Sequence, residues 1–295
     1  MKYIYSVVVI LFSIAIPDVA ITHAIANDDN NIKTKPSIVA LSPHIVEMLY
    51  DIGAGEQIIG TTTFADYPEQ AKKIPTIGNY MRLQIERVVE LQPDLIIAWK
   101  SGNPSDDLTR LKQLGFTIVY SQPKSFEDIA KELRYFANIT GHNIKGEQVA
   151  LAFEKELVKV TSQFKNKAPI LGFYELWSRP LTTVARGSWP QQHLAICQVT
   201  NPFENAITSY PQINIEQLIP LSVDLIIQPL SINQKEREGF NWQPWSIIPA
   251  VANQNIIQPN ADALHRMTLR SLPALKELCL SVDKIRNNLA KNKSS

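Results

Sequence analysis

Short apolar runs alternate with segments of helical spacing in the first part of the chain. Residues 37–41 and 58–62 are apolar runs that predict buried strands. Between them, residues 45–52 carry apolar side chains at helical spacing, and Gly53 ends the pattern. A strand, a helix and a strand at these distances predict a layer of parallel α/β structure.

The chain contains an internal repeat. Residues 85–98 read IERVVELQPDLIIA, and residues 215–228 read IEQLIPLSVDLIIQ, 130 positions later, with seven of the fourteen positions identical. Each copy predicts a short helix, a turn at the aspartate and a buried strand. Solenoid repeats have periods of roughly 20–50 residues, so this spacing instead indicates one α/β unit used in each of two similar lobes. The alternative is a chance likeness of two common units, which the shared Glu and Asp disfavour.

A long helical region separates the two copies. Ser125 is a plausible N-cap, and apolar residues follow at helical spacing as far as Gly141. A second run, from about 145 to 165, predicts a helix of ~20 residues and ~30 Å. Such a helix is either a stiff spine between two lobes or an ordinary helix packed on one of them.

Beyond this region, the same kinds of pattern continue to the end of the chain. Strands are predicted near 169–174, 223–228 and 255–258, and a last helix near 271–291. The expected fold is therefore α/β, with two Rossmann-like lobes joined by a long rigid backbone helix. The expected boundaries are an N-terminal lobe at 37–124, a helical region at 125–167 and a C-terminal lobe at 168–295.

The first residues predict export. A short positive start is followed by an apolar run over 3–16, and Ala24-Ile25-Ala26 forms an A-x-A cleavage pattern. The run is shorter than the ~20 residues that a spanning helix needs. We therefore expect a signal peptide at 1–26, a flexible lead-in at 27–36 and a periplasmic mature chain that is not embedded in the membrane.

Two cysteines, Cys197 and Cys279, lie far from the cleavage pattern. Neither can carry a lipid anchor there, so we expect a mature protein that is monomeric and not tethered to the membrane. In an oxidising compartment two such cysteines favour one disulfide, with two buried thiols as the alternative.

Composition and motifs argue against several classes of function. Hydrophobic residues make up 45% of the chain and the net charge is +1, whereas a nucleic-acid binder usually shows a concentrated basic surface. We find no nucleophile elbow, phosphate-binding loop or dinucleotide fingerprint, and the mature histidines (His44, His142, His193 and His265) lack the spacing of a zinc motif. We therefore expect no enzyme, no cofactor and no metal site. Because distant residues can converge, a secreted two-lobed metal-dependent enzyme stays an alternative.

Aromatic residues stand beside turns in both predicted lobes. Loops after the strands of an α/β sheet line its ligand crevice, and aromatic rings there offer flat apolar contact to a large ring-like ligand. The alternative is that these aromatics brace turns. The candidates are Phe64, Tyr80, Trp99, Trp177 and Tyr210.

Glu86 and Glu216 occupy the same place in the two repeats, in the first turn of a predicted helix. The helix dipole alone favours a carboxylate there. Their pairing across the lobes indicates a further role, in which two related acidic points engage a symmetric partner.

Several stretches resemble the periplasmic cobalamin-binding proteins of ABC importers, within the wider group of siderophore, haem and cobalamin receptors. The resemblance covers both lobes and most of the mature chain. The stretches that carry it are ALSPHIVEMLYDIGA, GTTTFADYPEQAKKIPTIGNYMRLQIERVVELQPDLIIAWKSGNP, FYELWSRPLTTVARG and YPQINIEQL.

The resemblance implies a ligand cleft between two lobes, and it implies roles for particular residues. Glu86 and Glu216 would dock onto arginines of a permease dimer, and Cys197 would pair with Cys279. Ligand contacts would come from Phe64, Tyr80, Trp99, Tyr210, Asp262, Ala263, Leu264, His265 and Arg266.

Three kinds of ligand compete within this class. Cobalamin or a related corrinoid needs broad aromatic walls and no protein ligand to its metal, and we favour it as the cargo delivered to an ABC-type importer. Haem would use a side chain bound to iron, for which Tyr80, His44 and His265 are candidates. A ferric siderophore would favour an arginine cluster, which could draw on Arg82, Arg179, Arg186 and Arg266.

Overall fold

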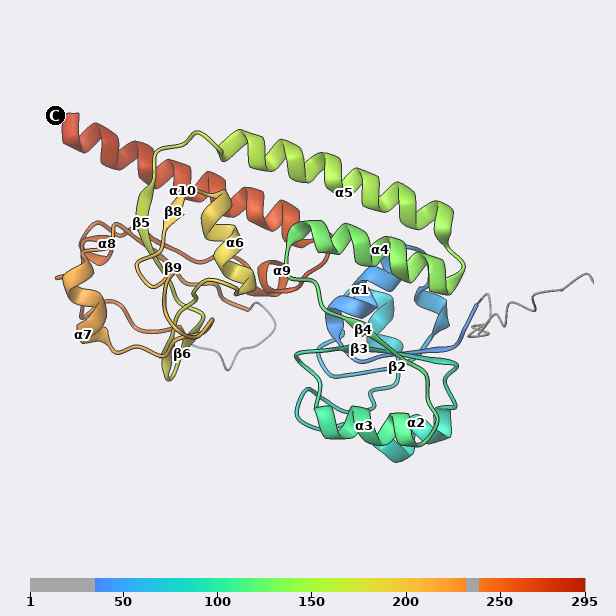
Figure 1. Cartoon of the computed structure of the whole chain (residues 1–295). Helices are drawn as coiled ribbons and strands as arrows, with labels where there is room; N and C mark the ends of the chain where they lie inside the picture. The colour runs from blue at the N-terminus through green and yellow to red at the C-terminus, as the bar shows by residue number, and fades with distance from the viewer. Residues whose placement is uncertain (1–34, 232–238, 295) are drawn as a thin grey trace, which may run out of the picture. The chain divides into compact units, whose positions relative to one another are not determined.

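A computed structural model describes residues 35–231 and 239–294 of the chain (Figure 1). The predicted signal peptide at 1–26 and the lead-in up to residue 34 lie outside these described residues. Within the described ranges, none of the helices combines the length and the apolar character that crossing a bilayer requires.

The first lobe is built on a four-stranded parallel sheet with the order β2-β1-β3-β4. Its strands are β1 (Ile38–Ala40), β2 (Ile58–Thr61), β3 (Leu95–Trp99) and β4 (Ile118–Ser121). Its connecting helices and helical turns are α1 (Pro43–Asp51), η1 (Gly55–Gln57), η2 (Glu69–Lys73), α2 (Ile85–Leu91) and α3 (Ser105–Gln113).

The second lobe repeats this topology with a parallel sheet of order β10-β9-β5-β8. Its strands are β5 (Ile170–Tyr174), β8 (Val199–Thr200), β9 (Leu225–Ile227) and β10 (Ile256–Ile257). A small hairpin adds β6 (Trp177–Ser178) and β7 (Leu181–Thr182). The helical segments are α6 (Trp189–Ile196), α7 (Ile215–Leu218), η3 (Ile219–Leu221), α8 (Pro249–Ala252), α9 (Ala261–His265) and α10 (Ser271–Ser294).

The internal repeat corresponds to the same piece of each lobe. Numbered within its own sheet, each lobe has the strand order 2-1-3-4, and the repeated sequence forms the third strand and the helix before it. The repeat therefore reflects two lobes of one topology, as the sequence predicts.

Both faces of the first sheet are covered, because successive side chains of a strand point to opposite faces. In β1, Ile38 and Ala40 enter one hydrophobic core, and Val39 enters another. The core that holds Ile38 is continuous with residues of α4, α5, α10 and β9, so it extends through both lobes. The strands are accordingly apolar runs without polar alternation.

The predicted helical region consists of α4 (Phe126–Thr140) and α5 (Asn143–Phe164). Ser125 caps α4 in a capping box with Asp128, as expected, and Gly141 follows in the left-handed conformation that ends the helix. In Figure 1, α5 runs beside α4 and then beside α10 of the second lobe, and residue contacts join it to both. The long helix therefore belongs to neither lobe alone, which favours the spine over the alternative.

The helices α4 and α5 are tied together in two ways. Arg134 donates hydrogen bonds to the carboxylates of Glu147 and Glu154 at distances from 2.6 to 3.1 Å. A Cβ at Gly146 would lie 2.1 Å from the Cβ of Ala137, so only glycine permits this close approach.

A disulfide joins Cys197, at the end of α6, to Cys279 of α10. This confirms the pairing that the resemblance implied. The bond closes a loop with a sequence separation of 82 and links the middle of the second lobe to its last helix.

His193 is a fully buried histidine of α6 that contacts the rings of Phe126 and Trp189. Neither ring nitrogen has a hydrogen-bond partner among the described residues. Burial lowers the pKa of His193 from 6.5 to about 3, and nearby His265 adds to this effect. The folded protein therefore keeps this side chain neutral.

Replacing His193 with Phe should stabilise the fold by about 1–3 kcal/mol, because it removes a buried polar group without partners. The unfolded chain binds a proton at His193 near pH 6.5, while the folded chain does not until about pH 3. The free energy of unfolding therefore falls as the pH drops through this interval, and His193→Phe should flatten that fall. Urea unfolding at pH 7 and pH 4.5 measures both effects, and an unchanged pH slope would contradict the neutral buried ring.

Candidate functional site

Three of the five predicted aromatic contacts lie at the carboxyl ends of parallel strands. Phe64 follows the end of β2 by three residues, and Trp99 is the last residue of β3. In the second lobe, Trp177 follows the end of β5 by three residues. In open α/β sheets, ligands bind in the crevice outside the carboxyl ends of the strands, so these residues are placed where a ligand would be expected.

Four of these aromatic side chains are open to solvent. Their exposed fractions are 53% for Phe64, 65% for Tyr80, 42% for Trp177 and 50% for Tyr210. These four rings therefore leave apolar surface open to solvent, and the indole N–H of Trp177 also donates to the carbonyl oxygen of Arg179 at 3.0 Å within its own turn.

Trp99 is the exception among the five, because it is half-buried. Its ring packs edge-on against His44, with 5.5 Å between the ring centres. It also lies directly over Gly102, where a Cβ would come within 1.8 Å of the indole. Trp99 therefore braces the turn after β3 and leaves only part of its ring for a ligand.

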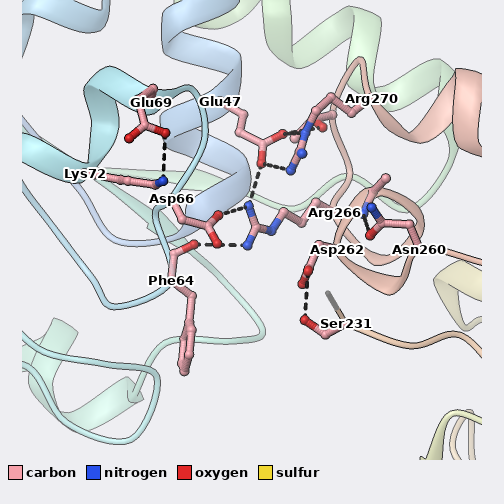
Figure 2. A network of polar contacts seen from close by, with 12 residues as sticks. Glu47, Phe64, Asp66, Glu69, Lys72, Ser231, Asn260, Asp262, Arg266 and Arg270 are labelled. Carbon is pink, nitrogen blue, oxygen red and sulfur yellow. Dashed lines mark hydrogen bonds and ion pairs between the residues drawn. The ribbon is translucent and has the colours of Figure 1, made fainter. Parts of the chain in front are cut away.

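The carboxyl edges of the two sheets meet at Arg266, which follows α9 in the second lobe. Its Nη1 donates to Glu47 Oε1 at 2.9 Å and to Asp66 Oδ1 at 2.6 Å, and its Nη2 donates to the carbonyl oxygen of Phe64 at 3.1 Å. Figure 2 shows this network, with the ring of Phe64 pointing away from it. The contacts bring a predicted residue of each lobe together.

The α9 segment is joined to its own lobe by two further contacts. Asp262 Oδ2 accepts a hydrogen bond from Ser231 Oγ at 2.8 Å, and His265 Nε2 lies 2.9 Å from the hydroxyl of Tyr174. His265 also lines a pocket with Trp177. The segment is thus held between β5 and the loop after β9.

Leu264 differs from Asp262, Ala263 and His265 in its burial. The side chain of Leu264 is fully buried in the shared core, and its carbonyl accepts a hydrogen bond from Trp189 Nε1 at 2.7 Å. The backbone N–H of Ala263 donates to the N-cap Asn260. Leu264 therefore anchors α9 by packing, while the half-buried Asp262, Ala263 and His265 stay candidates for contact.

Tyr210 is joined to the same region through Trp189. Burial raises the pKa of Tyr210, and a hydrogen bond from the backbone N–H of Trp189 acts in the opposite direction. Because Trp189 also holds Leu264, Tyr210 and α9 share a support. Tyr80 stands on a turn between Gly78 and Arg82 in the first lobe.

Glu86 and Glu216 are exposed, and each lies in the first turn of a helix, α2 and α7. The side chain of Glu86 is 78% exposed and lies 3.7 Å from Arg110. At the start of α7, Asn214 and Gln217 cap each other, so Glu216 is not needed for the cap.

The contacts of His44 and Arg266 weaken the two alternative ligands, haem and a ferric siderophore. His44 is buried, and its two ring nitrogens contact Ser42 and Ser121 at 2.7 and 2.9 Å, so neither is available to iron. Burial, with a smaller effect of Arg266, lowers the pKa of His44 to about 3. The charge of Arg266 is balanced by two carboxylates, which weakens it as part of an anion-binding cluster. Among the residues that the structure describes, no three His, Cys, Asp or Glu side chains gather to hold a metal ion.

Sequence reasoning missed the charged partners of Arg266. Glu47 is 1% exposed and also accepts from Thr268 Oγ1 at 2.8 Å and from Arg270 at 2.6 and 3.0 Å. A signal was present, because Glu47 is the one charged residue in the apolar run HIVEMLY. A carboxylate in a helix that is buried on most sides indicates a charged partner from elsewhere in the fold.

Comparisons with known proteins agree with this architecture. The sequence profile of the family described as periplasmic binding protein matches residues 38–263. A vitamin B12-binding protein of Vibrio cholerae is 35% identical over 246 residues, which is 82% of this chain and 87% of the relative. A vitamin B12-binding protein of Pectobacterium carotovorum is 31% identical over 244 residues, 82% of this chain and 86% of the relative.

Solved structures extend the comparison to the fold. The crystal structure of the periplasmic vitamin B12-binding protein of Vibrio cholerae matches with a TM-score of 0.78 at 33% identity, over 85% of this chain and 98% of that one. An apo periplasmic haem-binding protein from Roseiflexus matches with a TM-score of 0.76 at 22% identity, over 85% and 99%, which is a likeness of fold alone. On the profile match and the identity to curated relatives, this chain belongs to the periplasmic binding protein family.

Proposed function

We propose that this protein captures cobalamin or a related corrinoid in the periplasm and delivers it to an ABC-type importer. The observation that carries the proposal is the set of exposed aromatic rings at the carboxyl edges of the strands in both lobes, led by Phe64 and Trp177. Relatives named vitamin B12-binding proteins, at 31–35% identity over most of the chain, support the same ligand.

The chemistry of the candidate site suits a large, flat and mostly neutral ring system. Exposed rings supply apolar contact, and a few polar groups such as Asp262 can orient the amide side chains of a corrinoid. No protein ligand to cobalt is required. The contacts proposed for the ligand are Phe64, Tyr80, Trp99, Trp177, Tyr210, Asp262, Ala263 and His265.

Haem is the second candidate, favoured by one observation. Tyr80 is 65% exposed, so its hydroxyl could reach an iron atom. Absorption spectra of the purified protein titrated with haem and, separately, with cobalamin distinguish the two. A tyrosinate-to-iron band that is lost in Tyr80→Phe would replace cobalamin with haem.

Delivery requires a partner in the membrane. Glu86 and Glu216, one per lobe, are proposed to dock onto basic residues of a symmetric permease dimer. Their equivalent positions in two lobes of one topology allow each carboxylate to meet one subunit. We further propose that export through a cleaved signal peptide at 1–26 brings the mature chain to this partner as a monomer.

Replacing Tyr80 with Ala should weaken cobalamin binding by ~1–3 kcal/mol, because it removes an exposed ring from the proposed wall. Isothermal titration calorimetry of the wild-type and variant proteins measures this loss. Tyr135 on α4 is a matched control, since its ring is also exposed (45%) but lies on a helix remote from the strand ends. Equal affinities of the wild type and Tyr80→Ala would exclude Tyr80 from the site, and no measurable binding by the wild type would exclude cobalamin.

A further inference from the structure

We propose that Arg266 is a positioning residue, which holds the turn formed by residues 62–66 from the opposite lobe and acts on the ligand through Phe64. We call these residues the Phe64 turn. The ligand-binding part of this inference rests on the proposed function, whereas the part that concerns the turn does not.

Phe64 has a backbone conformation that needs outside support. Its φ of 69° lies in the left-handed region, which a bulky side chain rarely adopts. Such a conformation persists only where the surrounding structure holds it, and it is often found at functional sites. The ring of Phe64 is 53% exposed, so packing of the ring cannot be the main support.

Arg266 supplies the missing support at two points of the turn. One guanidinium nitrogen binds the carbonyl oxygen of Phe64 at 3.1 Å, and the other binds the carboxylate of Asp66 at 2.6 Å. In Figure 2 the ring of Phe64 extends on the side away from these contacts. Arg266 thus holds the turn through the backbone carbonyl of Phe64 and the side chain of Asp66, while the ring of Phe64 stays exposed.

Glu47 in turn fixes the direction of Arg266. Its buried carboxylate accepts from Arg266 at 2.9 Å, and Thr268 and Arg270 hold the same carboxylate in place. The side chain of Arg266 is only 13% exposed. Three of its five N–H groups are used by the first lobe, so most of its bonding capacity serves the protein rather than a ligand.

The arrangement makes the Phe64 turn dependent on both lobes. Arg266 lies 219 positions from Glu47 and 200 from Asp66, so its contact adds support from the second lobe to the hydrogen bond that Thr63 N–H donates to Gly78 O within the first lobe. A shift of α9 relative to the first sheet would move or release Phe64. The ligand wall in one lobe is therefore set by a side chain from the other.

Arg266→Lys tests the inference, because lysine keeps the charge but lacks the planar fork that binds several acceptors at once. In the ligand-free protein, amide hydrogen exchange across 62–66 should become ~10-fold faster. Arg134→Lys is the matched control, since Arg134 also bridges two carboxylates but lies on α4. Unchanged exchange in Arg266→Lys would overturn the inference. Asp66→Asn, which keeps the bond between Arg266 and Glu47, provides a second variant with the same expected direction.

A double-mutant cycle on cobalamin affinity then separates positioning from contact. Arg266→Lys should weaken binding ~10-fold in the wild-type background but less than about 2-fold in Phe64→Ala, because the two residues act as one unit. Effects that multiply would show direct contact of Arg266 with the ligand and overturn the positioning role. If the wild type binds no cobalamin, the proposed function fails, and the exchange measurement alone decides about Arg266.

Discussion

Reversing the charge of both Glu86 and Glu216, to Arg, should abolish cobalamin uptake and complex formation with the transporter at moderate salt. The two carboxylates are exposed, in the first turns of α2 and α7, at equivalent positions of the repeat. Surface ion pairs are individually weak, but paired charges fix orientation and speed encounter. Two arginines would face the basic residues of the partner and repel them at both contacts.

Ligand affinity and melting temperature should stay near the wild-type values in the same double variant, because neither glutamate caps its helix or enters a core. Uptake in whole cells, pull-down with the transporter and calorimetry with cobalamin measure the three properties. Glu90→Arg with Glu277→Arg is a control with the same change in charge at exposed positions of the two lobes. Normal uptake by the Glu86 and Glu216 variant would refute the docking role, and lost ligand affinity would place these residues in the cleft.

Replacing Glu47 with Leu should lower the free energy of unfolding by roughly 3–5 kcal/mol, because it removes a buried carboxylate shared by Arg266 and Arg270 and leaves the partly buried charge of Arg270 without its carboxylate partner. Glu47 is 1% exposed and receives hydrogen bonds from three side chains of the second lobe. Arg266 keeps Asp66, whereas Arg270 loses the only carboxylate with which the described structure pairs it.

Thermal and urea unfolding measure the loss. Glu69→Leu is the control, since Glu69 forms a 2.7 Å pair with Lys72 at the surface (Figure 2) and should change the melting temperature little. A loss of stability in Glu47→Leu no larger than that of the control would mean that the buried network contributes nothing to holding the lobes together.

Local patterns predicted much of the fold. Strands buried on both faces are short apolar runs, and amphipathic helices carry apolar residues at fixed spacing, so β1, β2, β3, β5, β9, β10 and the long helices were predicted close to their observed bounds. The strands β4 and β8 and the β6–β7 hairpin were not predicted. Helix α1 is an instructive difference, since it begins at Pro43 rather than near residue 45. Proline is favourable in the first helical turn, where its missing N–H has no partner to lose.

The candidate site was predicted in part. Position after a strand end is a local property, so Phe64 and Trp177 could be recognised. Burial depends on residues far away in the chain, and this is why Leu264 was expected to face a ligand although its side chain is fully buried.

The α/β class, the two lobes and their relation follow from local patterns, because the repeat at 85–98 and 215–228 records one topology used twice. The pairing of charges depends on the three-dimensional fold. Glu47 and Arg266 are more than 200 positions apart, and neither shows in its own neighbourhood which partner it will have. The spacing of apolar residues along the sequence indicates which face of a helix or strand a side chain occupies. An ion pair between lobes depends instead on how the two sheets are placed relative to each other.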